Sequence, residues 1–339
     1  MDRDFLYDEL LDDELLGDNL MTSQVAQIRT KETTLLNDQA LNSLMAAGSY
    51  SECIQMLLDK GWGPAGENTP EELLTMEKDR LWQLMRSLCN AKEIKLLDIF
   101  RLSNDFHNLK AAIKESYIQK ELPHVYMDGG TVDISVIRKC TVDADFSALP
   151  IIMMRAAEEA REILFHTGDS QLCDVIIDRA CLQSILKAGQ DSGNALLKDY
   201  ADLKCASADI NIAIRACRAN KDTDFFQKAF VSCPSISVQK LIAACRNGID
   251  SVYEYLEQTT FADAIDAIKE SPAAFDRWCD NRMMKLIRPQ KYNAFTISPL
   301  AAFILAKENE IKSVRLILSG KLNSLPDELI KERLRESYV

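Results

Sequence analysis

Histidine, proline and glycine are scarce in this 339-residue chain, with 3, 9 and 12 copies respectively. The three histidines stand far apart and the ten cysteines contain no C-x-x-C pair, so no zinc-ligand spacing results. The sequence also lacks a G-x-x-x-x-G-K-[ST] loop, a G-x-S-x-G elbow, an H-E-x-x-H helix and a calcium loop. These absences argue against a catalytic chain and predict no metal and no cofactor.

Long hydrophobic runs are missing too. The longest uncharged apolar stretch, YNAFTISPLAAFILA at 292–306, has 15 residues, whereas a membrane-spanning helix needs about 20. We interpret this stretch as a buried core helix with Ser298 as N-cap and Pro299 at its first position. The N-terminus lacks a basic-then-apolar signal sequence, and the scattered cysteines are typical of small buried side chains in a reducing compartment. The sequence therefore predicts a cytoplasmic protein.

Acidic residues outnumber basic ones by 52 to 40, for a net charge of −12. The first 20 residues contribute −7 of this charge, from eight acidic residues and one arginine. An acidic surface repels phosphate backbones and anionic lipids, which disfavours nucleic-acid binding and electrostatic docking on a membrane. The acidic segment, 1–23, is interpreted as a solvated helix or frayed tail, with a clamp for a basic partner as the alternative.

Helix signals cover most of the chain. In SYSECIQMLLDKG, Ser49 and Glu52 have capping-box spacing, apolar residues share one face, and Gly61 follows the last turn. The preceding NDQALNSLMAAG predicts a second helix, so the two form a hairpin. A further helix is expected to begin after Thr69, with Pro70 at its first position.

The stretch GWGPAG, 61–66, matches the dinucleotide fingerprint G-x-G-x-x-G. That fingerprint needs a strand before the first glycine and free backbone N–H groups facing the pyrophosphate. Here a helix ends at Gly61, the next begins about eight residues later, and Pro64 has no N–H to donate. We therefore predict a loop between helices with Trp62 folded onto the core, and no direct nucleotide binding.

The alternation in TVDISVI, 131–137, suits a strand or a short helix equally, and no second strand is available to pair with it. An all-α fold is thus favoured. The dipeptide DR recurs at Asp79, Asp178 and Asp276, about 100 residues apart, and each copy precedes a helix with a polar, an aliphatic and a basic residue. DR also occurs at Asp2, so chance recurrence is the alternative. This recurrence predicts three related helical units, 24–130, 131–232 and 233–339.

Several stretches resemble the C subunit of bacterial V/A-type ATPases, a family that also includes the d subunit of the vacuolar ATPase. They are VAQIRTKETTLLND, SYSECIQMLLDKGWG, NDFHNLKAAIK, QLCDVIIDR and, most specifically, the last 38 residues, AFILAKENEIKSVRLILSGKLNSLPDELIKERLRESYV. The resemblance runs from about residue 24 to the last residue. The acidic segment before it departs from the short N-terminus expected in the family.

The resemblance implies an all-helical, funnel-shaped protein of three similar subdomains with pseudo-three-fold symmetry and no active site. It implies a socket between the rotating central stalk of the ATP-hydrolysing head and the cytoplasmic face of the membrane proteolipid ring. Such a protein is peripheral to the membrane and transmits the rotation that drives proton or sodium transport. A free-standing helical-repeat adapter is the alternative, and a nicotinamide enzyme would rest on GWGPAG alone.

Coupling sets an energetic requirement on the predicted socket. A unit charge crossing 100 mV is worth about 2.3 kcal/mol, while an exposed ion pair contributes about 0–1 kcal/mol. We therefore expect a partly desolvated interface of about 1,600 Å² or more. The candidates for lining it are polar helix positions of the three units: Asn108, Lys110, Asn211, Arg215, Glu310, Lys312 and Arg315.

Bracing of helices within each unit is the alternative role for these residues. The basic tail residues Lys331, Arg333 and Arg335 are further candidates, either for contact with a carboxylate-bearing neighbour or for offsetting the negative end of a helix dipole. His107, on an amphipathic helix without a second ligand at suitable spacing, is interpreted as a packed or half-exposed residue.

Overall fold

The computed structural model describes residues 21–63 and 69–339. The acidic segment 1–20 and the Pro64, Ala65 and Gly66 positions of GWGPAG lie outside the described residues. The predicted all-α fold is confirmed, since the described chain forms helices and a single isolated β-bridge, Cys233 to Ile236. It divides into two compact units, one made of the described residues up to Ile94 with Glu270–Val339 and the other of Lys95–Lys269.

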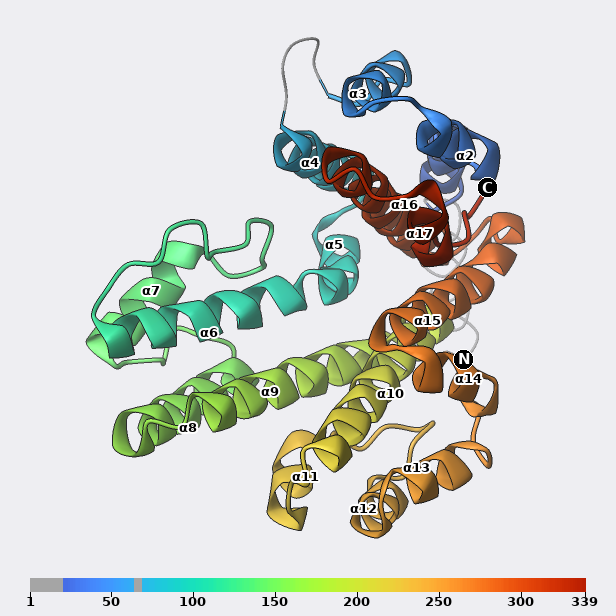
Figure 1. The fold of residues 1–339 in the computed structure, drawn as a ribbon. Coiled ribbons are helices and arrows are strands. Elements are labelled where there is room, and N and C mark those ends of the chain that lie inside the picture. The colour runs from blue at the N-terminus through green and yellow to red at the C-terminus, as the bar shows by residue number, and fades with distance from the viewer. Residues whose placement is uncertain (1–20, 64–68) are drawn as a thin grey trace, which may run out of the picture. The chain divides into compact units, whose positions relative to one another are not determined.

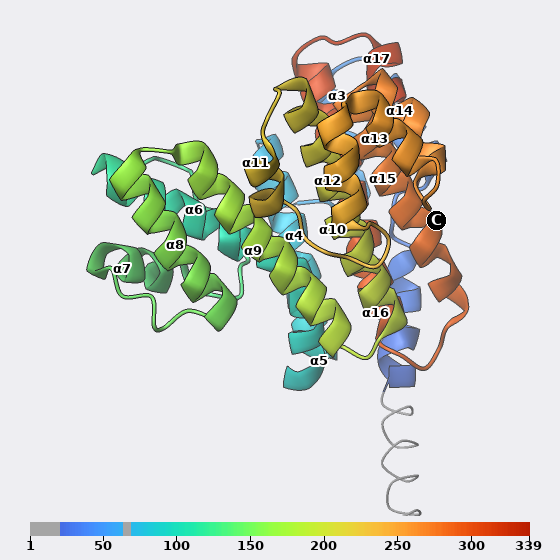
Figure 2. The ribbon, with the colours of Figure 1, turned by 90° about the horizontal axis from the view of Figure 1, so that it is seen from below.

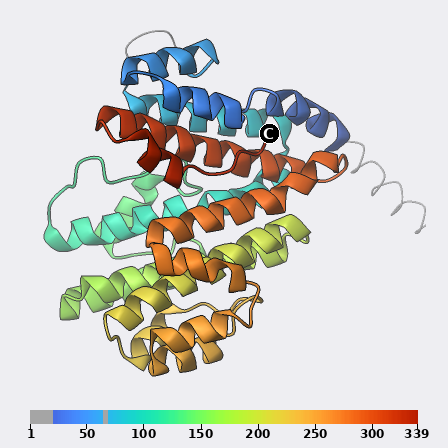
Figure 3. The same cartoon turned by 45° about the vertical axis from the view of Figure 1, so that its right-hand side comes forward.

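The first unit joins the two ends of the chain (Figure 1). It contains a helix that includes residues 21–32 and the following elements: α2 (Asp38–Ala46), α3 (Tyr50–Asp59), α4 (Pro70–Leu88), α15 (Pro272–Ile287), the 3-10 helix η3 (Arg288–Tyr292), α16 (Ser298–Leu322) and α17 (Asp327–Arg333). The red α16 of Figure 3 contacts α2, α3, α4, α15 and α17. Its apolar residues surround the helix, which suits a central position.

The second unit is built around α9 (Ser170–Asp191), which contacts α6, α8, α10 and α11 (Figure 2). Its other elements are η1 (Asp98–Phe100), α6 (Leu102–Ile118), α7 (Ile134–Asp143), α8 (Ile151–Thr167), α10 (Ala195–Arg218), α11 (Thr223–Ala229), α12 (Val238–Asn247), α13 (Ile249–Leu256) and η2 (Ala262–Ala264). α5 (Ala91–Leu97) and α14 (Ile265–Glu270) lie at the boundaries between the units. The division into compact units does not show whether segments of the chain are related to one another. The three related helical units therefore stay a prediction.

The local helix signals are confirmed with one refinement. Ser49 caps α3 by accepting the Glu52 N–H, but the Glu52 carboxylate accepts from the Gly48 N–H at 2.7 Å instead of from Ser49. Thr69 and Glu72 form a complete capping box at α4. The ambiguous segment 131–137 enters a helix, because Asp133 caps α7.

The loop after α3 also follows the prediction. Gly61 has a left-handed φ of +86° directly after the helix cap, and Trp62 is buried at 2% exposure. The Lys307 ammonium lies 4.2 Å from the centre of the Trp62 ring. The Trp62 side chain therefore packs into the core where α3 ends.

The buried helix predicted to open at Ser298 is confirmed, and its start differs from the prediction by one residue. α16 begins at Ser298, its N-cap is Ile297, and no side chain caps it, so Ser298 is the first helical residue instead of the cap. Residues 298–306 are buried as expected. Residues 293–297 form a loop, because Asn293 Nδ2 donates to Gln290 Oε1 and Thr296 Oγ1 and its Oδ1 accepts from the Phe295 N–H.

Candidate functional site

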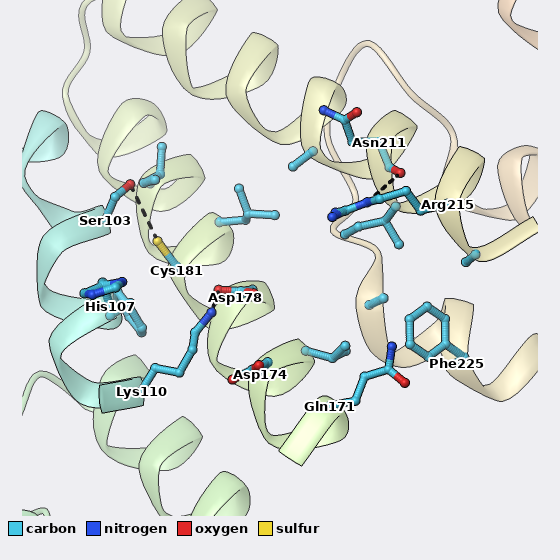
Figure 4. A pocket seen from close by; sticks show the side chains of 18 of the residues that line it. Ser103, His107, Lys110, Gln171, Asp174, Asp178, Cys181, Asn211, Arg215 and Phe225 are labelled. Carbon is cyan, nitrogen blue, oxygen red and sulfur yellow. Dashed lines mark hydrogen bonds and ion pairs between the residues drawn. The ribbon is translucent and has the colours of Figure 1, made fainter. Parts of the chain in front are cut away.

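A groove of about 800 Å³ runs between α6, α9, α10 and α11 in the second unit (Figure 4). Its apolar lining comes from all four helices and includes Phe106, Val175, Leu182, Ile185 and Ile212. Charged and polar side chains of the same helices surround this lining. An apolar floor with a polar rim is the composition of a protein interface.

Two ion pairs bridge the α6 and α9 sides of the groove. Lys110 Nζ lies 2.6 Å from Asp178 Oδ1, and Lys114 Nζ lies 2.6 Å from Asp174 Oδ1. The two lysines are four residues apart on α6, and the two aspartates are four residues apart on α9. The later lysine pairs with the earlier aspartate, as expected for antiparallel helices. The pairs are partly exposed, so each contributes modestly to stability and positions its charge at the rim.

The α10 side presents Arg215 from an exposed position. Its Nε donates to the carbonyl oxygen of Asn211, one turn earlier, over a long 3.3 Å. Within the described chain Arg215 forms no ion pair. Nearby, Lys221 Nζ donates to Gln171 Oε1 at 2.7 Å and lies 5.4 Å from the centre of the Phe225 ring. Arg215 is thus an exposed cation of the groove whose charge is available to a partner.

The potentially reactive groups of the groove are inert. Burial raises the pKa of Cys181 to about 11, and its Sγ lies 3.9 Å from Ser103 Oγ. A thiol with this pKa is protonated at neutral pH and is a poor nucleophile. His107 Nε2 lies 2.9 Å from the Val125 carbonyl oxygen. These side chains serve packing and contact.

The predicted site residues separate into two groups. Lys110, Asn211 and Arg215 all line the groove, although they were expected in two different units. Asn108, on α6 as well, is fully buried. Its Nδ2 donates to the Met127 carbonyl oxygen and its Oδ1 accepts from the Met127 N–H, both at 2.8 Å. Asn108 therefore holds the loop at Met127 to α6.

The α16 residues lie in the first unit and also make internal contacts. Glu310 is buried, pairs with Lys307 at 2.6 Å and accepts from the Leu36 N–H. Lys312 Nζ donates to Asp280 Oδ1 at 2.8 Å. Arg315 donates to Glu71 at 2.7 Å through an exposed pair. The Lys307–Glu310 pair lies within α16, whereas the contacts with Leu36, Asp280 and Glu71 hold α16 to other segments.

The three basic tail residues differ in environment. Lys331 and Arg333 are exposed in the last turn of α17, where positive charge favours the helix dipole. Arg335 Nε donates to Asp280 Oδ2 at 2.5 Å within the first unit. Of the three, Lys331 and Arg333 present their charge to solvent.

Sequence reasoning missed two exposed aromatic residues. Tyr292 is 92% exposed and Phe295 is 59% exposed. Arg29 holds their loop by donating to the carbonyl oxygens of Gln290 at 2.6 Å and Asn293 at 2.8 Å. The loop is thus firmly held while its aromatic side chains face solvent. Asn293 and Thr296, which interrupt the apolar run, were the signal for a loop.

The described residues provide neither a metal-binding cluster nor a membrane-spanning helix. Across residues 21–63 and 69–339, no group of three or more His, Cys, Asp or Glu side chains is arranged to hold a metal ion. No helix in the same part of the chain combines the length and apolar character needed to cross a membrane. All ten cysteines are free thiols, seven of them buried and three half-buried.

The described residues form an all-helical fold, and the groove is its candidate binding surface. The chain belongs to the ATP synthase (C/AC39) subunit family, whose model matches residues 24–333. This family comprises non-catalytic subunits of rotary ATPase complexes, so the chain is a subunit of a V/A-type ATPase.

Relatives extend along almost the whole chain. The C subunit of the V-type sodium ATPase of Enterococcus hirae is 24% identical over 319 residues, covering 92% of this chain and 97% of the relative. The C subunit of the A-type ATP synthase of Methanocaldococcus jannaschii is 21% identical, with 91% and 84% covered. The C subunit of the V-type ATP synthase of Deinococcus radiodurans is also 21% identical, with 91% and 89% covered.

Proposed function

We propose that this chain is the socket that couples rotation of the central stalk to the proteolipid ring at the cytoplasmic face of the membrane. The observation that carries the proposal is the family match along 24–333. The helical fold and the protonated Cys181 thiol of the groove agree with a part that transmits torque through contact. Ion transport would then belong to the assembled complex.

We assign the groove to the contact with the stalk. An amphipathic helix is the partner that such a surface suits, because its apolar face covers Val175, Leu182 and Ile212 while the rim charges select its orientation. Arg215 would pair with a carboxylate of that helix. The groove supplies only part of the expected area of about 1,600 Å², so other surfaces must contribute.

The loop of Tyr292 and Phe295 is the second proposed contact surface. Aromatic side chains that fill a partner's pocket are frequent hot spots of protein interfaces. Because Arg29 already holds the loop, little conformational entropy is lost when it binds. Lys331 and Arg333 add exposed positive charge for a carboxylate-bearing neighbour.

The decisive experiment is a pull-down of the tagged chain from its native membranes in mild detergent, with the co-purifying proteins identified by mass. We expect stalk, head and proteolipid subunits in one complex. Deletion of the chain is expected to abolish ATP-driven ion pumping while the head retains hydrolysis. Recovery of the chain with unrelated soluble proteins only would contradict the socket and favour an adapter.

The groove assignment has its own test. Arg215→Glu should weaken retention of stalk subunits, because it places a carboxylate opposite the proposed carboxylate. Lys198→Glu is the matched control, since Lys198 is also exposed on α10 and does not line the groove. Equal retention of the stalk by both variants would remove the groove from the contact.

A further inference from the structure

A second concavity of the Lys95–Lys269 unit, separate from the groove, has a different chemistry. It encloses about 300 Å³ between α8, α9 and α11. α8 supplies Arg155 and Glu159, α9 supplies Arg179 and Gln183, and α11 supplies Lys228. Ile152, Ala156, Ile176 and Ala180 complete the lining. Three cations thus meet one carboxylate at an apolar floor.

The cations of this pocket are not neutralised by partners. At the groove, Lys110 pairs with Asp178, and Lys114 pairs with the lining residue Asp174. In the pocket, neither Arg155, Arg179 nor Lys228 forms an ion pair or a side-chain hydrogen bond with another described residue. Even Glu159, one helical turn from Arg155, does not pair with it. This concentration of free positive charge occurs in a chain of net charge −12.

Arg179 is the most informative member. Its Nε is buried and has no hydrogen-bond partner in the described protein. A buried guanidinium donor without an acceptor is unfavourable. The nearby Asp209 carboxylate acts on Arg179 only electrostatically, since its oxygens accept from the Val231 N–H. An acceptor from outside the chain would therefore satisfy the Arg179 Nε donor.

The donor set identifies the ligand chemistry. Guanidinium groups bind the oxygens of phosphate and carboxylate through paired hydrogen bonds, and a lysine adds a mobile point charge. Gln183 adds a neutral amide donor. The apolar floor lowers the local dielectric and strengthens each of these contacts. A volume of about 300 Å³ is at the small end of ligand sites.

We propose that Arg155, Arg179 and Lys228 form a binding site for a phosphate-type oxyanion, with Gln183 as a further donor. The preferred ligand is a diphosphate group, because three separated cations match more than one phosphate. The site is independent of the socket role and of GWGPAG. If the site exists, an anion that binds between α8, α9 and α11 of the folded chain should stabilise it against unfolding.

Calorimetric titration with inorganic pyrophosphate, at constant ionic strength set with sodium chloride, is the test. We expect saturable binding to the full chain and a higher melting temperature with pyrophosphate. The double variant Arg155→Ala with Lys228→Ala should raise the Kd by about tenfold or more, because charge-assisted hydrogen bonds to the anion are lost. Both side chains are exposed, so this variant should fold.

Two controls make the test specific. Lys187→Ala with Lys240→Ala removes the same charge from exposed positions outside the pocket and should leave the Kd unchanged. Glu159→Gln should tighten binding, because it removes the carboxylate from the lining. Titration with ADP, which carries the same diphosphate group, tells whether the ligand is free pyrophosphate or a diphosphate within a larger molecule. Equal affinity for the two assigns the site to any diphosphate. Binding of pyrophosphate alone assigns it to the free anion.

Absence of saturable binding by both pyrophosphate and ADP would overturn the proposal. Equal weakening by the two double variants would overturn it as well, because binding would then follow net charge and not this pocket.

Discussion

Arg335 Nε donates to Asp280 Oδ2 at 2.5 Å and so ties the end of the chain to α15. Lys312 of α16 donates to the other oxygen of the same carboxylate at 2.8 Å. Further along, the Glu336 carbonyl oxygen accepts from Asn309, and Tyr338 Oη donates to Glu32 at 3.1 Å. Residues 335–338 therefore act as a strap, holding α15, α16 and the helix that includes 21–32 together.

Replacing Asp280 should loosen this strap. Asp280→Asn is expected to lower the free energy of unfolding by about 1.5–3 kcal/mol at pH 7, the range for hydrogen bonds to charged groups. Burial alone would raise the pKa of Asp280, but Lys312 and Arg335 outweigh it and hold the pKa below its ordinary value. The stabilisation is thus present above the unfolded pKa of about 3.9 and is lost as the pH falls through the folded value.

Denaturant unfolding of wild type and variant at pH 7 and at low pH measures this effect. Asp327→Asn is the control, because its pair with Lys321 is exposed on the aspartate side and should cost about 0–1 kcal/mol. A loss for Asp280→Asn that is equal at both pH values would contradict the electrostatic account.

Gly189 marks the closest approach of α9 and α10. A Cβ at this position would lie 2.6 Å from the Ala201 Cβ and 2.8 Å from the Leu197 carbonyl oxygen. Gly189→Ala should destabilise the chain by about 1–3 kcal/mol through overpacking, despite the gain in helix propensity of about 1 kcal/mol. Thermal unfolding checks this, with Gly48→Ala as control because its added Cβ would meet its nearest neighbour at 3.4 Å. Stabilisation by Gly189→Ala would refute the close packing.

Asp209 should make stability depend on pH near neutrality. Burial raises its pKa to about 7, although the Val231 N–H and Arg179 lower it. Between the unfolded pKa of about 3.9 and about 7, the folded state holds a proton that the unfolded state has lost, so stability decreases as the pH rises. The decrease is at most about 1.4 kcal/mol per pH unit.

Asp209→Asn should remove this contribution while leaving an oxygen for Val231. The difference in unfolding free energy, variant minus wild type, is expected to be more positive at pH 8 than at pH 5. Urea unfolding of both proteins across that pH range measures it. Parallel pH profiles of the two proteins would exclude a titrating Asp209.

Tyr292 and Phe295 should matter for assembly and not for folding. Because both side chains are exposed, Tyr292→Ser with Phe295→Ser should change the unfolding free energy by about 0.5 kcal/mol or less per site. Retention of the other ATPase subunits in a pull-down should fall sharply. Val142→Ser, at a residue 76% exposed, is the control and should retain them. Full retention by the double variant would remove this loop from the interface.

Short-range interactions account for what could be predicted from the sequence. The caps at Ser49 and Thr69 act on backbone groups three residues away, so spacing alone reveals them. Trp62 and the fold class followed from apolar periodicity and the glycine at the helix end. The predicted N-cap of α16, Ser298, was off by one residue, because residue type alone does not fix where the backbone leaves the helical conformation. The loop before it depends on a distant donor, Arg29, which no local pattern reveals.

The candidate site depended on contacts between segments far apart in sequence. Polar spacing selected both Lys110, which reaches the groove, and Asn108, which is buried two residues away. The rotation of α6 against its neighbours decides between them.

By itself, the sequence determined the helices, their caps and the family, because these are recorded in local spacing and in residue identity. Only the tertiary structure decided which charges remain available to a partner. Glu310 reaches Leu36 across 274 positions and Arg335 reaches Asp280 across 55. Such pairs form when packed helices bring distant residues within hydrogen-bonding distance. The packing leaves charges unpaired at Arg215 and around Arg179, and these charges can bind another molecule.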